Sequence, residues 1–271
     1  MSKSLCIRLK STILSFNMLA SVGVGVFLLT WHIFFNLIIY NLSVGPLTLN
    51  EMGSMFLNDI YNSHARSGFD LFAPILAVLP SSTLFCDDYT SGYIKPILGR
   101  VDKKRYMRET VICSSIAGGL AVFLPSFITS IFYMSIGVPN SPELLLQGQA
   151  TFLDESIFSD IQFVWGGGLV IILLLVLAFL FGSLWSNVGL YVSSVFPNRY
   201  ITLASPFILY FALHLIFYRL DFLLFLSPVT MLMPVVTFIR NLAYPFVYQI
   251  VLTILVVTLF KRNVERRIAD V

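Results

Sequence analysis

The sequence predicts an all-α integral membrane protein with six transmembrane helices. Of the 271 residues, 57% are hydrophobic and only 11% are charged, and the mean hydropathy is +0.86. A soluble domain carries roughly 25% charged residues, because its exterior contacts water. A bilayer accepts an apolar exterior, and a helix satisfies its own backbone hydrogen bonds there. The third observation is the spacing of the apolar runs along the chain.

A helix needs about 20 apolar residues to cross the hydrocarbon of a bilayer. Six apolar runs approach or exceed this length, and they predict one transmembrane domain over residues 1–271. The second run is the shortest of the six, and the fourth is long enough to continue beyond the membrane. The predicted spans are 18–40, 69–85, 111–136, 164–195, 201–218 and 242–260.

The basic residues predict which side of the membrane the loops face. On this topology 14 of the 17 Lys and Arg residues lie on one side, and only Arg66, Arg219 and Arg240 lie on the other. Cytoplasmic loops carry an excess of Lys and Arg. The sequence therefore predicts a cell-membrane protein with both termini in the cytoplasm.

The segment 219–241 is predicted to be a re-entrant element on the outer face. It is apolar, but Pro228 and Pro234 interrupt it. A seventh span here would place the basic tail 261–267 outside, against the charge rule. Irregular backbone at membrane depth has to be covered by protein or line a wet cavity.

The first 16 residues are predicted to form an amphipathic helix on the membrane surface. Apolar side chains share one stripe of the helix, and basic and serine side chains, Arg8 among them, occupy the opposite side. A helix of this kind lies in the interface plane. The alternative is a plain basic flank of the first span. The apolar stripe consists of Leu5, Cys6, Leu9, Ile13 and Phe16.

A search for chemical motifs mainly excludes functions. The chain has no Walker A loop, no Gly-x-Gly-x-x-Gly and no His-Glu-x-x-His motif, and its three cysteines are scattered. We therefore predict no catalytic residue, cofactor or metal site. An intramembrane hydrolase that uses Ser183 and His214 is a weak alternative, because serine beside glycine more often marks close helix packing. The span centres carry few ionisable groups, so the energy for any transport would come from a partner.

The segment 86–109 between the second and third spans has the most distinctive pattern. Asp87 and Asp88 suit the first turn of a short helix, where carboxylates meet free N–H groups. Tyr89 and Tyr93 are four residues apart, which predicts one shared face. Ile94 and Ile97 extend the apolar exposure toward a break at Pro96 and Gly99, and a basic cluster starts at Arg100. A helix with an aromatic knob that inserts into a soluble partner and an ordinary basic loop both fit this pattern.

The same segment resembles the signature of ABC type-2 exporter permeases, in which a coupling helix transmits the movement of an ATPase. Asp88 matches the acidic residue and Gly92 the glycine of that signature; apolar residues follow, then Lys103 and Lys104 for the basic residue and Tyr106 for the aromatic one. Thr110 departs from it, because the family has a lysine there. The resemblance implies ATPase coupling by Asp88, Tyr89, Gly92, Tyr93, Ile94, Ile97, Leu98 and Arg100.

The resemblance implies the transmembrane subunit of an ABC exporter for a hydrophobic or amphipathic substrate, such as a peptide, a lipid or a drug-like molecule. Its expected partners are a separate cytoplasmic ABC ATPase, a second copy or a related permease, and membrane lipid, but no nucleic acid. ATP hydrolysis would occur on the ATPase, so the chain is not expected to be an enzyme. The alternative is a non-transporting membrane anchor or immunity protein that binds a partner.

Overall fold

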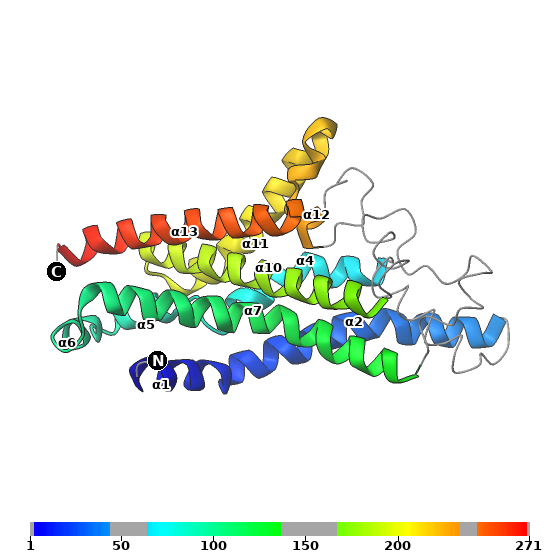
Figure 1. The fold of residues 1–271 in the computed structure, drawn as a ribbon, viewed down its shortest axis with the longest axis horizontal. Helices are drawn as coiled ribbons and strands as arrows, with labels where there is room; N and C mark the ends of the chain where they lie inside the picture. Colours follow the sequence, from blue (N-terminus) through cyan, green and yellow to red (C-terminus); the bar gives the residue numbers. More distant parts are fainter. Residues whose placement is uncertain (1–2, 44–63, 137–166, 233–242, 270–271) are drawn as a thin grey trace.

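The computed structural model describes residues 3–43, 64–136, 167–232 and 243–269 as an elongated helical bundle (Figure 1). Every regular element in these ranges is a helix, which confirms the predicted all-α class. Within them, four helices are long and apolar enough to cross a membrane, and a bent pair raises this number to five if it forms one span. The helices are those of a multi-pass membrane protein, and this count is lower than the six spans predicted.

The N-terminal segment forms a short helix that is separate from the helix after it. Helix α1 (Lys3–Ile13) is followed by α2 (Phe16–Ser43), and the two are bent by 46° at the intervening break. Ser15 lies at the break, where its hydroxyl donates to the Thr12 carbonyl at 2.7 Å and accepts from the Met18 N–H at 3.2 Å. A serine in this position caps the following helix, so the bend is encoded locally.

The predicted second span, 69–85, is not one continuous helix. Helix α4 (His64–Val78) has only 15 residues and ends two residues before Pro80. Proline has no N–H for a helical hydrogen bond and disfavours helical backbone in the residue before it. A turn follows, and the chain resumes in the short helices α5 (Leu84–Thr90) and α6 (Ile94–Leu98).

Helices α7 (Lys103–Ile136) and α10 (Gly167–Val195) pack closely at small residues. A Cβ atom at Gly182 would overlap the carbonyl group of Gly118. Beside this crossing, Ser183 Oγ donates to the Ser115 carbonyl at 2.7 Å, and the hydroxyls of Ser114 and Ser186 lie 2.7 Å apart. Small side chains and hydroxyl hydrogen bonds are the usual means of packing helices in a bilayer.

The last part of the chain contributes two long helices and two short ones. Helix α11 (Arg199–Arg219) is capped by Asn198, whose side chain accepts from the Tyr200 N–H at 2.9 Å. The 3₁₀ helix η1 (Asp221–Leu226) and α12 (Pro228–Leu232) follow, and α13 (Ala243–Ala269) ends the described chain. These two short helices lie in the predicted element 219–241, whose residues 233–241 are outside the described residues.

The buried apolar residues form one cluster in the middle of the bundle and another at one end. The central cluster joins α4, α10 and α11 through Phe69, Phe181 and Tyr210, among others. The end cluster joins α5 and α6 to α7, α10 and α13. Helix α1, helix α6 and the C-terminal end of α13 gather at this same end (Figure 1), so both ends of the described chain lie on one side of the bundle.

Candidate functional site

The candidate site is the end of the bundle where α5 and α6 lie, because the predicted coupling residues fall on these two helices and the turns beside them. The chain turns between them at Gly92, whose φ is +70°. This left-handed region favours glycine, because a side chain there crowds the following carbonyl. The predicted coupling segment is therefore two short helices joined by a turn.

Helix α5 starts earlier than the sequence predicted. It begins at Leu84, which places Asp87 in the first turn and Asp88 in the middle of the helix. The carboxylate of Asp88 is therefore not held by free N–H groups at a helix start. It is held by side chains from two other helices.

Arg8 and Tyr106 both bind the carboxylate of Asp88. The Nη2 atom of Arg8 on α1 lies 2.8 Å from Asp88 Oδ2. The hydroxyl of Tyr106 on α7 donates to the same oxygen at 2.8 Å. The guanidinium of Arg8 also lies over the Tyr106 ring, 5.1 Å from its centroid, where a cation is attracted to the ring face.

This cluster extends along α7 toward the middle of the helix. Arg8 Nη1 donates to Thr110 Oγ1 at 3.3 Å, and the same hydroxyl donates to the Tyr106 carbonyl at 2.9 Å. One turn further on, Thr12 of α1 lies 3.7 Å from the Cys113 sulfur. Arg8 was expected on the polar face of a surface helix, but its side chain is only 23% exposed and is paired inside the protein.

The inner faces of α5 and α6 pack on the bundle. Ile94 is only 3% exposed, and Ile97 and Leu98 pack against the end cluster, whose core includes Phe85 and Phe260. The expectation that Ile94 and Ile97 extend an exposed apolar surface is therefore wrong for Ile94, and Ile97 is only partly exposed. They attach the two short helices to α7, α10 and α13, because burying aliphatic side chains is favourable there.

The two tyrosines of the segment point in different directions. Tyr89 stacks on Phe85 with ring centroids 5.9 Å apart, and the guanidinium of Arg267 lies 5.5 Å from the Tyr89 ring centroid. Tyr93 follows the Gly92 turn and is 58% exposed. The predicted shared face is wrong, because the helix breaks between the two residues. Tyr93 alone of this pair is presented outward.

Two basic residues that follow Tyr93 in the sequence are exposed. Lys95 and Arg100 are exposed on the α6 side. A hollow of about 400 Å³ lies between the start of α7 and the C-terminal part of α13. Its walls combine cationic side chains with two carboxylates: Asp102, Lys104, Arg105, Met107, Arg108, Lys261 and Glu265.

Cys86 of α5 is a buried thiol within this end of the bundle. It is 2% exposed, and burial raises the pKa of its thiol. The neighbouring carboxylate of Asp87 also raises this pKa, and the positive charge of Arg199 opposes the shift. A thiol in such surroundings is inert, because the thiolate is the reactive form.

Sequence reasoning missed the residues that α1 and α13 supply to the site. The sequence predicted that the last span ends at residue 260, whereas α13 continues to Ala269. Phe260 and Val264 are both buried in the end cluster, and their spacing of four residues is the helical signal that predicts it. For Arg8 no signal was present, because its partner lies 80 residues away in sequence.

Comparison with known proteins adds no further assignment: no family model, no curated protein and no solved structure matches the chain. Among the described residues, no group of His, Cys, Asp and Glu side chains could hold a metal ion. Ser183 and His214 are engaged separately, Ser183 with the Ser115 carbonyl and His214 Nδ1 with Ser227 Oγ at 2.9 Å.

Proposed function

We propose that the chain is the transmembrane permease subunit of an ABC exporter that moves a hydrophobic or amphipathic substrate. A separate ATPase would bind at the end of the bundle formed by α5 and α6, on the cytoplasmic side. A second copy or a related permease would complete the pathway through the cell membrane. Both termini would then be cytoplasmic, in agreement with the charge distribution of the loops.

The observation that carries the proposal is the contact of the Asp88 carboxylate with Arg8 and Tyr106. Asp88 matches the acidic residue of the exporter signature, and Tyr106 matches its aromatic residue. The Tyr106 hydroxyl donates a hydrogen bond to Asp88 Oδ2 at 2.8 Å, although the two residues are 18 positions apart in sequence. At Thr110, where the signature has a lysine, Arg8 Nη1 supplies a positive charge from α1 at 3.3 Å. The one departure from the signature is thus offset by a residue from elsewhere in the chain.

This arrangement supports a simple route for the transmission of force. An ATPase that binds the exposed Tyr93 side chain would transmit its own movement to the Gly92 turn. Because Ile94 and Phe85 are buried against α7, α10 and α13, the two short helices would move these long helices with them. The pair of Arg8 and Asp88 would carry the same movement into α1.

The test is a pull-down of the tagged chain from its native host in a mild detergent, with co-purifying proteins identified by mass. The proposal expects a near-stoichiometric P-loop ATPase that is lost from the Tyr93→Glu variant. Tyr218→Glu is the matched control, because Tyr218 is 62% exposed and lies near the far end of α11. Retention of the ATPase by both variants would contradict docking at Tyr93.

Recovery of the chain alone from several detergents would overturn the permease proposal. The chain would then act as a membrane anchor or an immunity protein. Transport in membrane vesicles gives a second readout, in which the Tyr93→Glu variant would remain in the membrane and lose ATP-driven export.

A further inference from the structure

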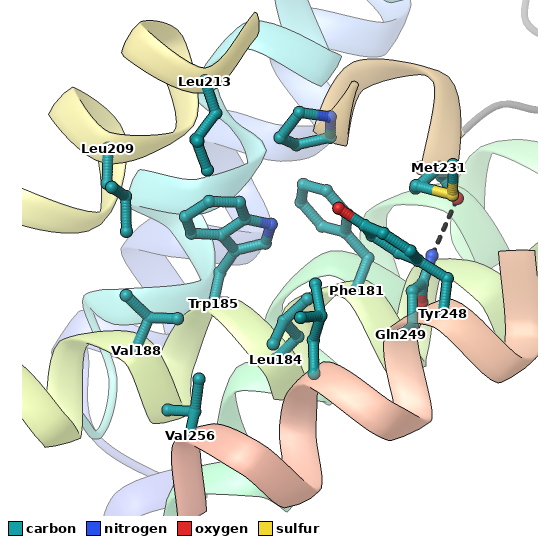
Figure 2. Close-up of a pocket in the computed structure, with 12 residues that line it drawn as sticks. Phe181, Leu184, Trp185, Val188, Leu209, Leu213, Met231, Tyr248, Gln249 and Val256 are labelled. Atoms are coloured by element: carbon teal, nitrogen blue, oxygen red, sulfur yellow. Dashed lines mark hydrogen bonds between the residues drawn. The ribbon is translucent and has the colours of Figure 1, made fainter. Parts of the chain in front are cut away.

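A cavity of about 150 Å³ lies among α10, α11, α12 and α13, away from the end of the bundle that bears Tyr93. Figure 2 shows Trp185 between Leu209 and Leu213 on one side and Tyr248 and Gln249 on the other. Most of the lining is aliphatic or aromatic, and no charged side chain contributes to it from the described residues. A cavity of about this size with an apolar lining accepts a molecule the size of benzene.

Two buried polar atoms of this lining lack a hydrogen-bond partner within the described chain. Gln249 is fully buried, and its Nε2 atom donates to the Met231 carbonyl at 2.7 Å, but its Oε1 atom has no donor. Trp185 is 3% exposed, and its Nε1–H has no acceptor. These two residues therefore place one unused acceptor and one unused donor just behind cavity walls whose exposed surface is apolar.

An unpaired buried polar atom is destabilising, so a partner for it is favoured energetically. A charged ligand is excluded, because the lining has no counter-charge to replace lost hydration. A neutral group that both donates and accepts a hydrogen bond matches the Gln249 oxygen and the Trp185 N–H. A secondary amide and a hydroxyl both have this property.

We propose that this cavity is a binding site for a neutral amphipathic molecule with a ring-sized apolar part and a secondary amide or hydroxyl group. The apolar part would lie against Leu184, Val188 and Leu252, and the polar group would pair with Gln249 Oε1 or with Trp185 Nε1. Neither atom is exposed to solvent, so the ligand has to displace part of the lining. Met231 is the most adaptable side chain there, because it is unbranched.

The inference does not depend on the proposed transport function, since it concerns binding to the chain alone. The experiment uses the full-length chain in detergent with Trp31→Phe and Trp165→Phe, which leaves Trp185 as the remaining one of three tryptophans. Three probes of similar size are titrated at fixed detergent concentration: N-methylbenzamide, 1-phenylethanol and isopropylbenzene. The readout is the saturable change in Trp185 emission.

The amide, the alcohol or both are expected to bind about tenfold more tightly than the hydrocarbon, which is the usual contribution of one net hydrogen bond. Gln249→Met should remove this preference and leave isopropylbenzene binding unchanged. Tyr244→Phe is the matched control, because Tyr244 ties α13 to the Phe225 carbonyl at 3.3 Å without lining the cavity.

Equal binding of all three probes to the unaltered cavity would overturn the proposal, and so would the absence of saturable binding by any probe. The comparison of the probes remains decisive if the Gln249→Met variant fails to fold. Because no ATPase is present, a negative result here leaves the pull-down on Tyr93 unaffected, and the two proposals can fail separately.

Discussion

The guanidinium of Arg8 and the carboxylate of Asp88 lie 2.8 Å apart and join two helices whose residues are 80 positions apart in sequence. Their side chains are 23% and 18% exposed, so water screens the pair only partly. Arginine stays protonated in proteins. The first helix of the chain is therefore held to the α5–α6 pair by a persistent charge interaction.

The first prediction concerns the energy of this pair. Asp88→Ala should lower the free energy of unfolding by about 1–3 kcal/mol, because it leaves the Arg8 charge half-buried without a counter-charge. Arg8→Ala should cost less than this. In the double variant the two losses should not add, and the coupling should be about 1–2 kcal/mol after allowance for solvent screening.

The measurement is unfolding of the purified chain in detergent for the wild type, both single variants and the double variant. Lys10→Ala serves as the control, because Lys10 is exposed on the same helix and its loss should change stability by less than about 0.5 kcal/mol. Fully additive losses would show that Arg8 and Asp88 do not interact.

The second prediction concerns the Gly92 turn. A Cβ atom at this position would meet no atom within 4 Å, so the effect of Gly92→Ala is one of backbone conformation alone. At a φ of +70° the substitution should destabilise the chain by about 1–2 kcal/mol. Gly92→Asn should cost less, because asparagine tolerates this region better than alanine.

The control for Gly92 is Gly23→Ala in α2, where an added Cβ also meets no atom within 4 Å. No positive φ applies at Gly23, so alanine should stabilise this helix by up to about 1 kcal/mol. Thermal unfolding of the two alanine variants should therefore move in opposite directions. Equal shifts would contradict the left-handed turn at Gly92.

The third prediction concerns the crossing of α7 and α10. Gly182→Ala should destabilise the bundle by about 1–3 kcal/mol, because the new methyl group would overlap the backbone of Gly118, which cannot move without separating the helices. Gly99→Ala is a milder change, because the nearest atom that its Cβ would meet is the Pro96 carbonyl oxygen at 3.7 Å. Size-exclusion profiles and unfolding temperatures of both variants test this, and a Gly182→Ala variant as stable as the wild type would contradict the close crossing.

The fourth prediction concerns the side of the membrane on which α1 lies. Cys6 is exposed, whereas Cys86 and Cys113 are buried. A membrane-impermeant maleimide should therefore label Cys6 in inverted vesicles and leave it unlabelled in intact cells, if the N-terminus is cytoplasmic as proposed. Labelling in intact cells would reverse the orientation, and Cys6→Ser is the control that assigns the signal.

The class of the fold and the positions of the long helices could be predicted from the sequence. Apolar runs of transmembrane length are a local property, so the predicted span 201–218 agrees with α11 within two residues at each end. The spans 111–136 and 242–260 agree with α7 and α13 at one end each, whereas α7 begins eight residues earlier and α13 ends nine residues later than predicted. The break at Pro80 was missed, because Leu84 and Phe85 extend the run 69–85 beyond the proline and the three hydroxyl residues after it. Hydropathy records composition and takes no account of a missing N–H.

The candidate site was predicted only where its signal lies within a few neighbouring residues. Asp88, Gly92 and Tyr106 were identified from the resemblance of this segment to the exporter signature, and the structure brings Asp88 and Tyr106 into contact. The burial of Ile94 was missed, because its partners come from α10 and α13. The role of Arg8 was missed for the same reason. The sequence of a short amphipathic helix predicts that its charged side chains are solvated, because it does not show which helix they face.

The last prediction concerns the pH at which Cys86 becomes reactive. Burial and the Asp87 carboxylate raise the pKa of this thiol above the ordinary value of about 8.5. The reactive thiolate is therefore scarcer than in a free thiol at every pH between about 7 and 9, and its labelling rate should rise only at higher pH. In a chain with Cys6→Ser and Cys113→Ser, the rate of maleimide labelling as a function of pH measures this against a small-molecule thiol. Asp87→Asn should shift the profile to lower pH, because it removes one of the groups that raise the pKa, whereas Arg199→Gln should shift it to higher pH, because the opposing positive charge is lost.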